Sequence, residues 1–189
     1  MDRTQEMGNA AQIIENELFA SQCRRLEQAY KKKDRRKEAT KDFSALFHQA
    51  TEMEKEVSWL GINYLHTSMK TRSYELAISL YTTEFIFDPF PIQMYWQPSL
   101  FFECFEEDLE IVMKELQRKY VRIRKYEEDF VQGICIEYYY AAVMQLLRDL
   151  EKDIIETEAF LNMRKSASFS AFYGRYCGEG DILWHISTI

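Results

Sequence analysis

The residues best suited to chemistry in this chain are charged side chains, and they are densest in a basic tract over residues 24–41. Nine lysines and arginines stand there against three acidic residues, a local charge of +6 in a chain of net charge −7. The remainder of the chain therefore sums to −13. Separated charge creates a directional field that orients a partner and speeds its association. The basic residues of the tract are Arg24, Arg25, Lys31, Lys32, Lys33, Arg35, Arg36, Lys37 and Lys41.

Two further charged stretches bear on what the basic tract binds. One is an acidic stretch, which we interpret mainly as the solvated face of a helix, and also as a candidate counterpart of the basic tract. The other is a second candidate basic patch, whose alternating charges a long exposed helix also explains without a ligand. The acidic stretch comprises Glu103, Glu106, Glu107, Asp108 and Glu110, and the second basic patch comprises Arg118, Lys119, Arg122, Arg124 and Lys125.

No motif indicates catalysis, a cofactor or a bound metal. The sequence holds no GxSxG elbow, P-loop, GxGxxG or HExxH pattern. His48, His66 and His185 lie far apart, and none has the spacing of a metal ligand to another. We therefore predict no catalytic residue, metal site or cofactor. An enzyme with a site that no motif reveals stays as an alternative, for example Cys104 or Cys135 beside a histidine.

Composition indicates a globular cytoplasmic protein. Hydrophobic residues make up 47% of the chain and charged residues 29%, which is typical of globular domains. No apolar run approaches the roughly 18 residues of a membrane span, and the opening residues do not resemble a signal peptide. We predict that the four well-separated cysteines are reduced thiols, as in the cytoplasm.

The spacing of apolar residues predicts mostly long helices. Residues 9–38 show a helical face, and residues 42–69 show a seam with the 3.5-residue period of a helix bundle or coiled coil. Residues 99–164 keep a heptad phase that slips near Gly133. The slip predicts either two helices with a break near 126–133 or one long kinked helix.

Strands are expected where the period becomes two. Three short alternating runs lie between Tyr74 and Trp96, the middle one around Phe85 and Phe87, and they predict a three-stranded antiparallel meander over 73–97. In the tail, residues 178–181 predict a turn and residues 182–186 a final strand.

These patterns together predict one α+β domain over residues 1–189. Four long helices would form a bundle-like core, and the three-stranded antiparallel meander would cover one side. The expected parts are an N-terminal helical arm (9–69), the meander (73–97), the long helices (99–164) and a C-terminal tail (165–189).

The functional prediction is a non-enzymatic cytoplasmic interaction or regulatory protein. It would bind a protein partner through a helical face, or a second copy of itself as a homodimer, and would not bind a membrane. The alternative is a nucleic-acid-associated regulator that uses the basic tract together with Arg122 and Arg124.

Overall fold

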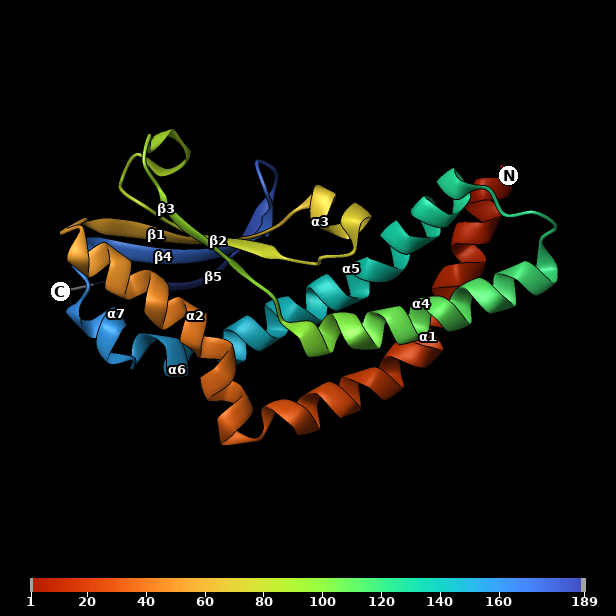
Figure 1. Cartoon of the computed structure of the whole chain (residues 1–189), viewed down its shortest axis with the longest axis horizontal. Coiled ribbons are helices and arrows are strands. Elements are labelled where there is room, and N and C mark those ends of the chain that lie inside the picture. Colours follow the sequence, from red (N-terminus) through yellow and green to blue (C-terminus); the bar gives the residue numbers. More distant parts are fainter. Residues whose placement is uncertain (1, 188–189) are drawn as a thin grey trace. The chain divides into compact units, whose positions relative to one another are not determined.

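The computed structural model describes residues 2–187, over which the chain forms seven α-helices, one 3-10 helix and five strands (Figure 1). The chain divides into two compact units. The first unit comprises the chain up to Lys31 together with Ser99–Val143. The second unit comprises Lys32–Pro98 together with the chain from Met144 onward.

Three helices build the first unit, and the second of them runs antiparallel to the first. Near the start of the first helix, Arg3 donates hydrogen bonds to the backbone carbonyls of Val121 and Arg122. At its other end, Tyr30 packs against Phe101 with 5.4 Å between ring centroids. The helices are α1 (Arg3–Tyr30), α4 (Ser99–Lys119) and the part of α5 (Lys125–Asp149) up to Val143.

The two long helices α1 and α4 bury very different amounts of side chain. Helix α4 presents an apolar stripe in which residues three and four apart recur, including Phe101, Phe105, Val112 and Leu116. Helix α1 is longer, yet its fully buried residues are few, and most of them are small or polar: Met7, Gly8, Ala11, Glu15 and Leu26. A narrow seam therefore holds α1 in the first unit.

A mixed five-stranded sheet in the order β3-β2-β1-β4-β5 forms the second unit. Strand β1 pairs in parallel with β4, and every other pairing is antiparallel. Because β1 is central and largely buried, its sequence reads as a nearly continuous apolar run. The strands are β1 (Val57–Tyr64), β2 (Leu76–Tyr81), β3 (Ile92–Trp96), β4 (Lys165–Arg175) and β5 (Gly180–Ser187).

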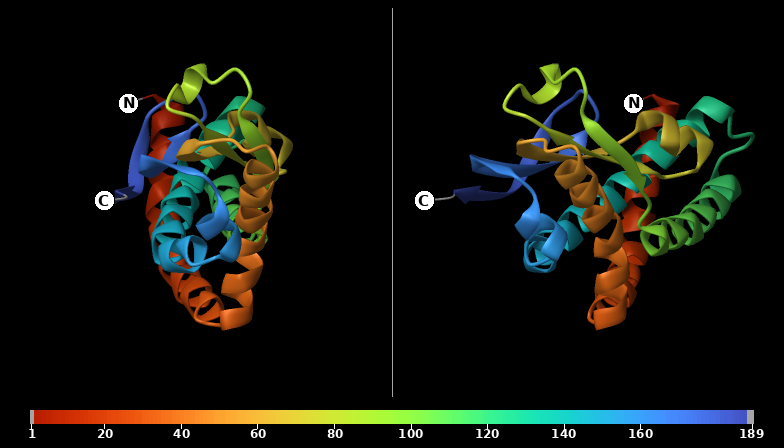
Figure 2. Two further views of the ribbon diagram at one scale, coloured as in Figure 1. Left: turned by 90° about the vertical axis from the view of Figure 1, so that its left-hand side faces the viewer. Right: turned by 60° about the vertical axis from the view of Figure 1, so that its left-hand side comes forward.

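Helix α2 packs on one face of the sheet, as Figure 2 shows, and two short helices lie beside it. Phe47 of α2 contacts Phe160, whose ring in turn meets Phe169 of β4; both centroid distances are 5.2 Å. Phe43 meets Trp96 of β3 at 5.3 Å. The helices are α2 (Lys33–Glu52), α6 (Glu151–Ile155) and α7 (Glu158–Asn162), while α3 (His66–Thr71) joins β1 to β2.

Aromatic rings cover part of the opposite face of the sheet. Trp59 and Phe172 lie on neighbouring strands, and Phe85 of the 3-10 helix η1 (Phe85–Phe87) packs against both, at 4.9 and 5.1 Å. Gly61 makes room for this packing, because a Cβ there would lie 2.7 Å from the Phe172 ring.

The predicted fold is wrong in its sheet and in its helical core. The chain is α+β, but the sheet has five strands and contains a parallel pair, so it is not a three-stranded antiparallel meander. Four long helices do not share one core, since α2 packs within the second unit. The C-terminal tail supplies two of the five strands. Strand β5 confirms the expected final strand, whereas β4 is the long strand that the prediction missed.

The predicted helix over 42–69 ends much earlier, because two different elements share its apolar pattern. Helix α2 ends at Glu52, and Glu54 then adopts a left-handed conformation with φ of 52°. Glycine usually occupies such a position after a helix. No glycine marks the end of α2, and the apolar residues of β1 follow almost directly. The apolar pattern therefore continues past the end of the helix.

Three other predictions of secondary structure also differ from the structure. The predicted helix over 9–38 is interrupted at Lys32, which has extended backbone angles. Residues 99–164 do contain a break, but it lies at 120–124 rather than at 126–133, and Gly133 lies inside α5. The expected strand around Phe85 is a 3-10 helix, because Phe85 has a φ of 54° that a strand does not accommodate.

We predict opposite effects for alanine at two glycines. A Cβ on Gly174 would lie 2.4 Å from the Glu179 carbonyl oxygen, which is backbone and must shift, so Gly174→Ala should destabilise the β4–β5 hairpin. A Cβ on Gly133 meets nothing within 4 Å, so Gly133→Ala should stabilise α5 by about 0.5–1 kcal/mol. Denaturant unfolding followed by circular dichroism measures both. Equal effects of the two substitutions would contradict this packing.

Candidate functional site

Buried and half-buried polar side chains gather between the three helices of the first unit, where apolar packing is expected. We call this set the interhelical polar cluster. All of its members lie on stripes that otherwise carry core residues; Glu15, for example, follows Ala11 by four residues on α1. The cluster consists of Glu15 and Gln22 from α1, Asp108 from α4, and Cys135 and Tyr139 from α5.

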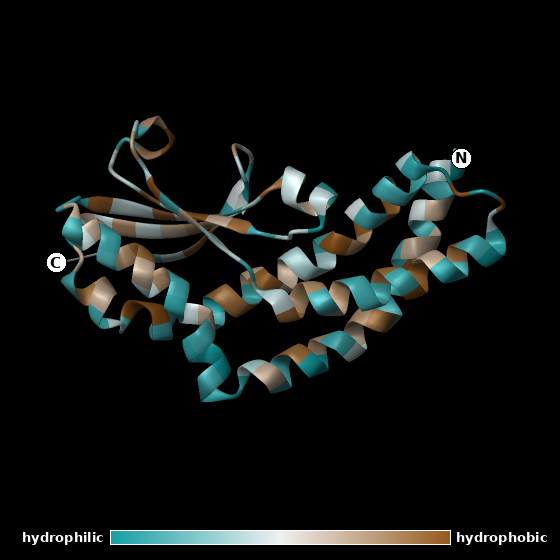
Figure 3. Ribbon diagram, in the orientation of Figure 1, coloured by the Kyte–Doolittle hydropathy of each residue, from teal (hydrophilic) through white to brown (hydrophobic). Residues whose placement is uncertain are grey.

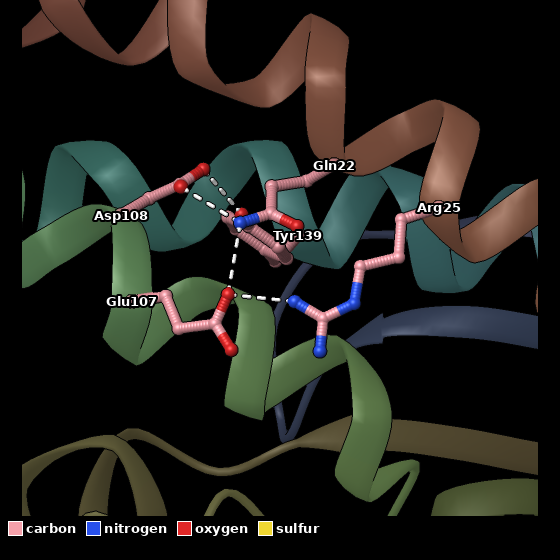
Figure 4. Close-up of polar contacts among 5 residues, drawn as sticks. All are labelled: Gln22, Arg25, Glu107, Asp108 and Tyr139. Atoms are coloured by element: carbon pink, nitrogen blue, oxygen red, sulfur yellow. Dashed lines mark hydrogen bonds and ion pairs between the residues drawn. The ribbon is translucent and has the colours of Figure 1, made fainter.

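Asp108 is the acceptor at the centre of the cluster (Figure 4). The Tyr139 hydroxyl donates to Oδ2 at 2.6 Å, and the Gln22 side-chain amide donates to Oδ1 at 3.0 Å. Asp108 is 1% exposed, so these donors replace the water that its carboxylate loses. Burial, and then the bond to Asp108, raise the pKa of Tyr139 far above its ordinary value, which keeps the phenol a donor.

Glu15 differs from Asp108 because no hydroxyl, amide or cationic donor among the described residues bonds its oxygens; the Cys135 thiol that faces it is only a weak donor. The side chain is fully buried. Burial, and then the nearby Asp108 carboxylate, raise the pKa of Glu15 from 4.5 to about 7, while the neighbouring Cys135 thiol lowers it. Near neutral pH the cluster thus contains one acid that holds or releases a proton.

The thiols of the first unit's core are not suited to nucleophilic attack. Burial raises the pKa of Cys104 to about 11 and that of Cys135 further still. The thiolate is the reactive form, so both cysteines are inert near neutrality. The three histidines all lie in the second unit. The raised pKa values of these buried thiols do not favour the alternative of a nucleophilic Cys104 or Cys135.

One histidine links two strands of the second unit. His185 Nδ1 lies 2.7 Å from Ser170 Oγ, and its Nε2 lies 3.0 Å from Ser187 Oγ. Ser170 is 6% exposed, which shields its hydroxyl from a substrate. We interpret these contacts as a cross-strand link rather than a catalytic pair.

The basic tract meets the acidic stretch at the rim of the interhelical polar cluster. Arg25 forms an ion pair with Glu107 at 2.6 Å, which Gln22 also approaches at 3.3 Å (Figure 4). Both charged side chains are about half exposed, so the pair contributes little to stability.

The acidic stretch does not form a uniformly solvated face. Glu103, Glu107 and Glu110 are exposed, Glu106 is half-buried and Asp108 is buried. The spacing contained the signal, because Asp108 follows Phe105 by three residues and precedes Val112 by four. It therefore lies on the apolar stripe of α4.

The basic tract is divided between the two units, and several of its members are unpaired. Arg35 pairs with Glu38 at 3.0 Å, and Arg36 pairs with Asp153 beside the end of α5. The other basic residues of the tract, Arg25 apart, are exposed and form no ion pair with any residue between 2 and 187. These are Arg24, Lys31, Lys32, Lys33, Lys37 and Lys41.

The second candidate basic patch surrounds the loop between α4 and α5. Arg118 pairs with Glu115, and Lys125 pairs with Asp129 at 2.9 Å, both within one helix. The remaining members, Lys119, Arg122 and Arg124, are exposed. As partner-binding surfaces, this patch and the basic tract both stay predictions.

The second unit contains a buried ion pair that the sequence did not indicate, and this pair holds the loop after β2 in place. Lys55 Nζ lies 2.8 Å from Asp88 Oδ2, and the two side chains are 13% and 4% exposed. Asp88 also accepts the backbone N–H groups of Thr82 and Phe90. Burial opposes the charged form of Asp88, but the bonds from Lys55 and the backbone outweigh it and lower the pKa.

Within residues 2–187, no group of three or more histidine, cysteine, aspartate or glutamate side chains is placed to hold a metal ion. Over the same residues, no helix combines the length and apolar character that crossing a membrane requires. All four cysteines are free thiols.

We predict that Tyr139→Phe destabilises the first unit by about 1.5–3 kcal/mol, because the buried Asp108 carboxylate loses a donor. Tyr138→Phe is the matched control. Tyr138 is half-buried and packs its ring on Phe19, so loss of its hydroxyl should change stability by less than about 0.5 kcal/mol. Urea unfolding curves give both values, and similar losses in the two variants would rule out a special role for the Asp108 bond.

We predict that Lys55→Met destabilises the second unit by about 3–5 kcal/mol, because it leaves the Asp88 carboxylate buried without its counter-charge. Lys152→Met removes an exposed pair with Glu156 and should cost less than about 1 kcal/mol. Since the folded pKa of Asp88 is lowered, the pair's stabilisation should be lost as pH falls through that pKa. A Lys55→Met variant as stable as Lys152→Met in urea would contradict a structural role for the pair.

Comparisons with protein-family models, with curated proteins and with solved structures found no match to this chain, so its function is argued from the geometry of its own residues.

Proposed function

We propose that this is a non-enzymatic interaction protein that binds an acidic surface of a partner protein through a row of lysines on α2. The lysine row consists of Lys33, Lys37 and Lys41. Residues four apart lie on the same side of a helix, so the three ammonium groups face one direction. The observation that carries the proposal is that all three are exposed and form no ion pair with a described residue.

The position of the lysine row supports an acidic partner. The N-terminal end of a helix carries a partial positive charge, which disfavours cations in its first turns. Lys33 and Arg35 lie in these turns, and the N-cap residue Lys32 makes no side-chain capping bond. The first turns of α2 are strongly hydrophilic in Figure 3. Asp34 offsets part of this repulsion, and a carboxylate of an approaching partner would offset more of it.

A protein partner fits the lysine row better than nucleic acid does. Asp34, Glu38 and Asp42 alternate with the lysines along α2, and a continuous phosphate backbone would be repelled by them. Carboxylates on a partner protein can be placed to avoid them. A second copy of the chain is one such partner, because its α4 carries the exposed Glu103 and Glu110. The free thiols support a cytoplasmic location as part of this proposal.

We predict that the triple variant Lys33→Glu, Lys37→Glu and Lys41→Glu keeps the wild-type circular dichroism but binds its partner about tenfold or more weakly at low salt. The measurement is quantitative capture of partners from cell extract across a salt series, with purified protein in sedimentation velocity to detect self-association.

The matched control replaces Lys70, Arg148 and Arg175 with glutamate; all three are exposed, form no ion pair with a described residue and change the net charge equally. Capture and self-association that respond alike to both triple variants would count against the lysine row. A mobility shift of random duplex DNA that the lysine-row variant alone abolishes would favour the nucleic-acid alternative instead.

A further inference from the structure

The first unit buries an acid without a counter-charge. Glu15 on α1 is 0% exposed, and neither carboxylate oxygen accepts a hydrogen bond from a hydroxyl, amide or cationic group among the described residues. Isolated ionised carboxylates are among the most costly groups to bury, because no donor replaces the lost water. The neutral acid is far less costly, so this site favours a protonated Glu15.

Among the groups that face Glu15, the Cys135 thiol is the one that favours its charged form, and a thiol is only a weak donor. Asp108 from α4 adds a second carboxylate, and α5 contributes the Cys135 thiol and the Tyr139 phenol, whose hydroxyl is committed to Asp108. No described cation forms an ion pair with Glu15. The α1 cations with partners in the first unit, Arg3 and Arg25, pair with Glu127 and Glu107 instead.

Helix α1 is the element that an ionised Glu15 would release. Its buried seam is narrow, and Glu15 lies between Ala11 and Leu26 within that seam. Half-buried Phe19 adds contacts with the rings of Tyr138 and Tyr139 one turn further on. A charge at this position therefore acts on the contact that holds α1 against α4 and α5.

We propose that Glu15 makes the seating of α1 pH-sensitive. With Glu15 protonated, α1 packs against α4 and α5; loss of the proton to solvent leaves two carboxylates in the seam and loosens α1. The inference does not depend on the lysine row, which lies in the second unit.

The direction of the pH effect follows from the shift at Glu15. Its pKa is about 7 in the folded unit and 4.5 when exposed, so the protonated acid is favoured by folding. The resulting stabilisation is complete below pH 4.5, falls as pH rises toward 7, and is absent above it. The difference between the two pKa values corresponds to about a 300-fold change in the opening equilibrium of α1.

Hydrogen exchange of the full-length protein tests the proposal. We expect protection of the α1 amides, corrected for intrinsic exchange rates, to fall by up to about 300-fold between pH 4.5 and pH 8 in the wild type. Glu15→Gln should remove most of this dependence, because the amide cannot ionise. Glu17→Gln, an exposed change two residues away on the same helix, should leave it intact.

A direct titration covers the case in which Glu15→Gln does not fold. The carboxyl carbon resonance of Glu15 in the wild type should titrate with a midpoint near 7 rather than near 4.5. The proposal fails if that midpoint is near 4.5, if α1 protection is the same at both pH values, or if a folded Glu15→Gln retains the wild-type dependence.

Discussion

The hydrogen bond between the Tyr139 hydroxyl and the Asp108 carboxylate is the constraint on which the first unit depends. It joins α4 to α5 inside the helical core, and the Gln22 amide adds α1 to the same acceptor. A carboxylate in this position is tolerated only while its donors remain in place. The three helices are therefore held in one register by polar groups, while the apolar contacts of α1 are few.

The same constraint gives Glu15 its unusual environment. Once Asp108 accepts from Tyr139 and Gln22, the cluster offers a second carboxylate only the weak Cys135 thiol donor, so burial and the nearby Asp108 dominate at Glu15. Donors surround Asp108, whereas burial and the nearby carboxylate favour the neutral form of Glu15. Environment, rather than residue type, separates their roles.

The second unit depends on different interactions: a buried central strand holds the sheet together, and a buried ion pair holds a surface loop. Parallel pairing of β1 with β4 brings distant segments together, and α2 covers the resulting sheet. The pair of Lys55 with Asp88 then sets the shape of the loop after β2. With the core satisfied on one side of α2, Lys33, Lys37 and Lys41 are left facing solvent.

The sequence by itself determined the mixture of helices and strands, the positions of β2, β3 and β5, and the charge segregation, because each rests on local periodicity or composition. Only the tertiary structure decided that β1 is a strand, that the Ser-rich segment before the final turn is β4, and that Asp108 and Glu15 are buried. Those outcomes depend on contacts between distant segments, and apolar runs such as Val57–Tyr64 are compatible with a helix until a partner strand is known. The burial of Glu15 follows the same logic: its spacing from Ala11 placed it on a stripe, but only packing against α4 and α5 removed its water.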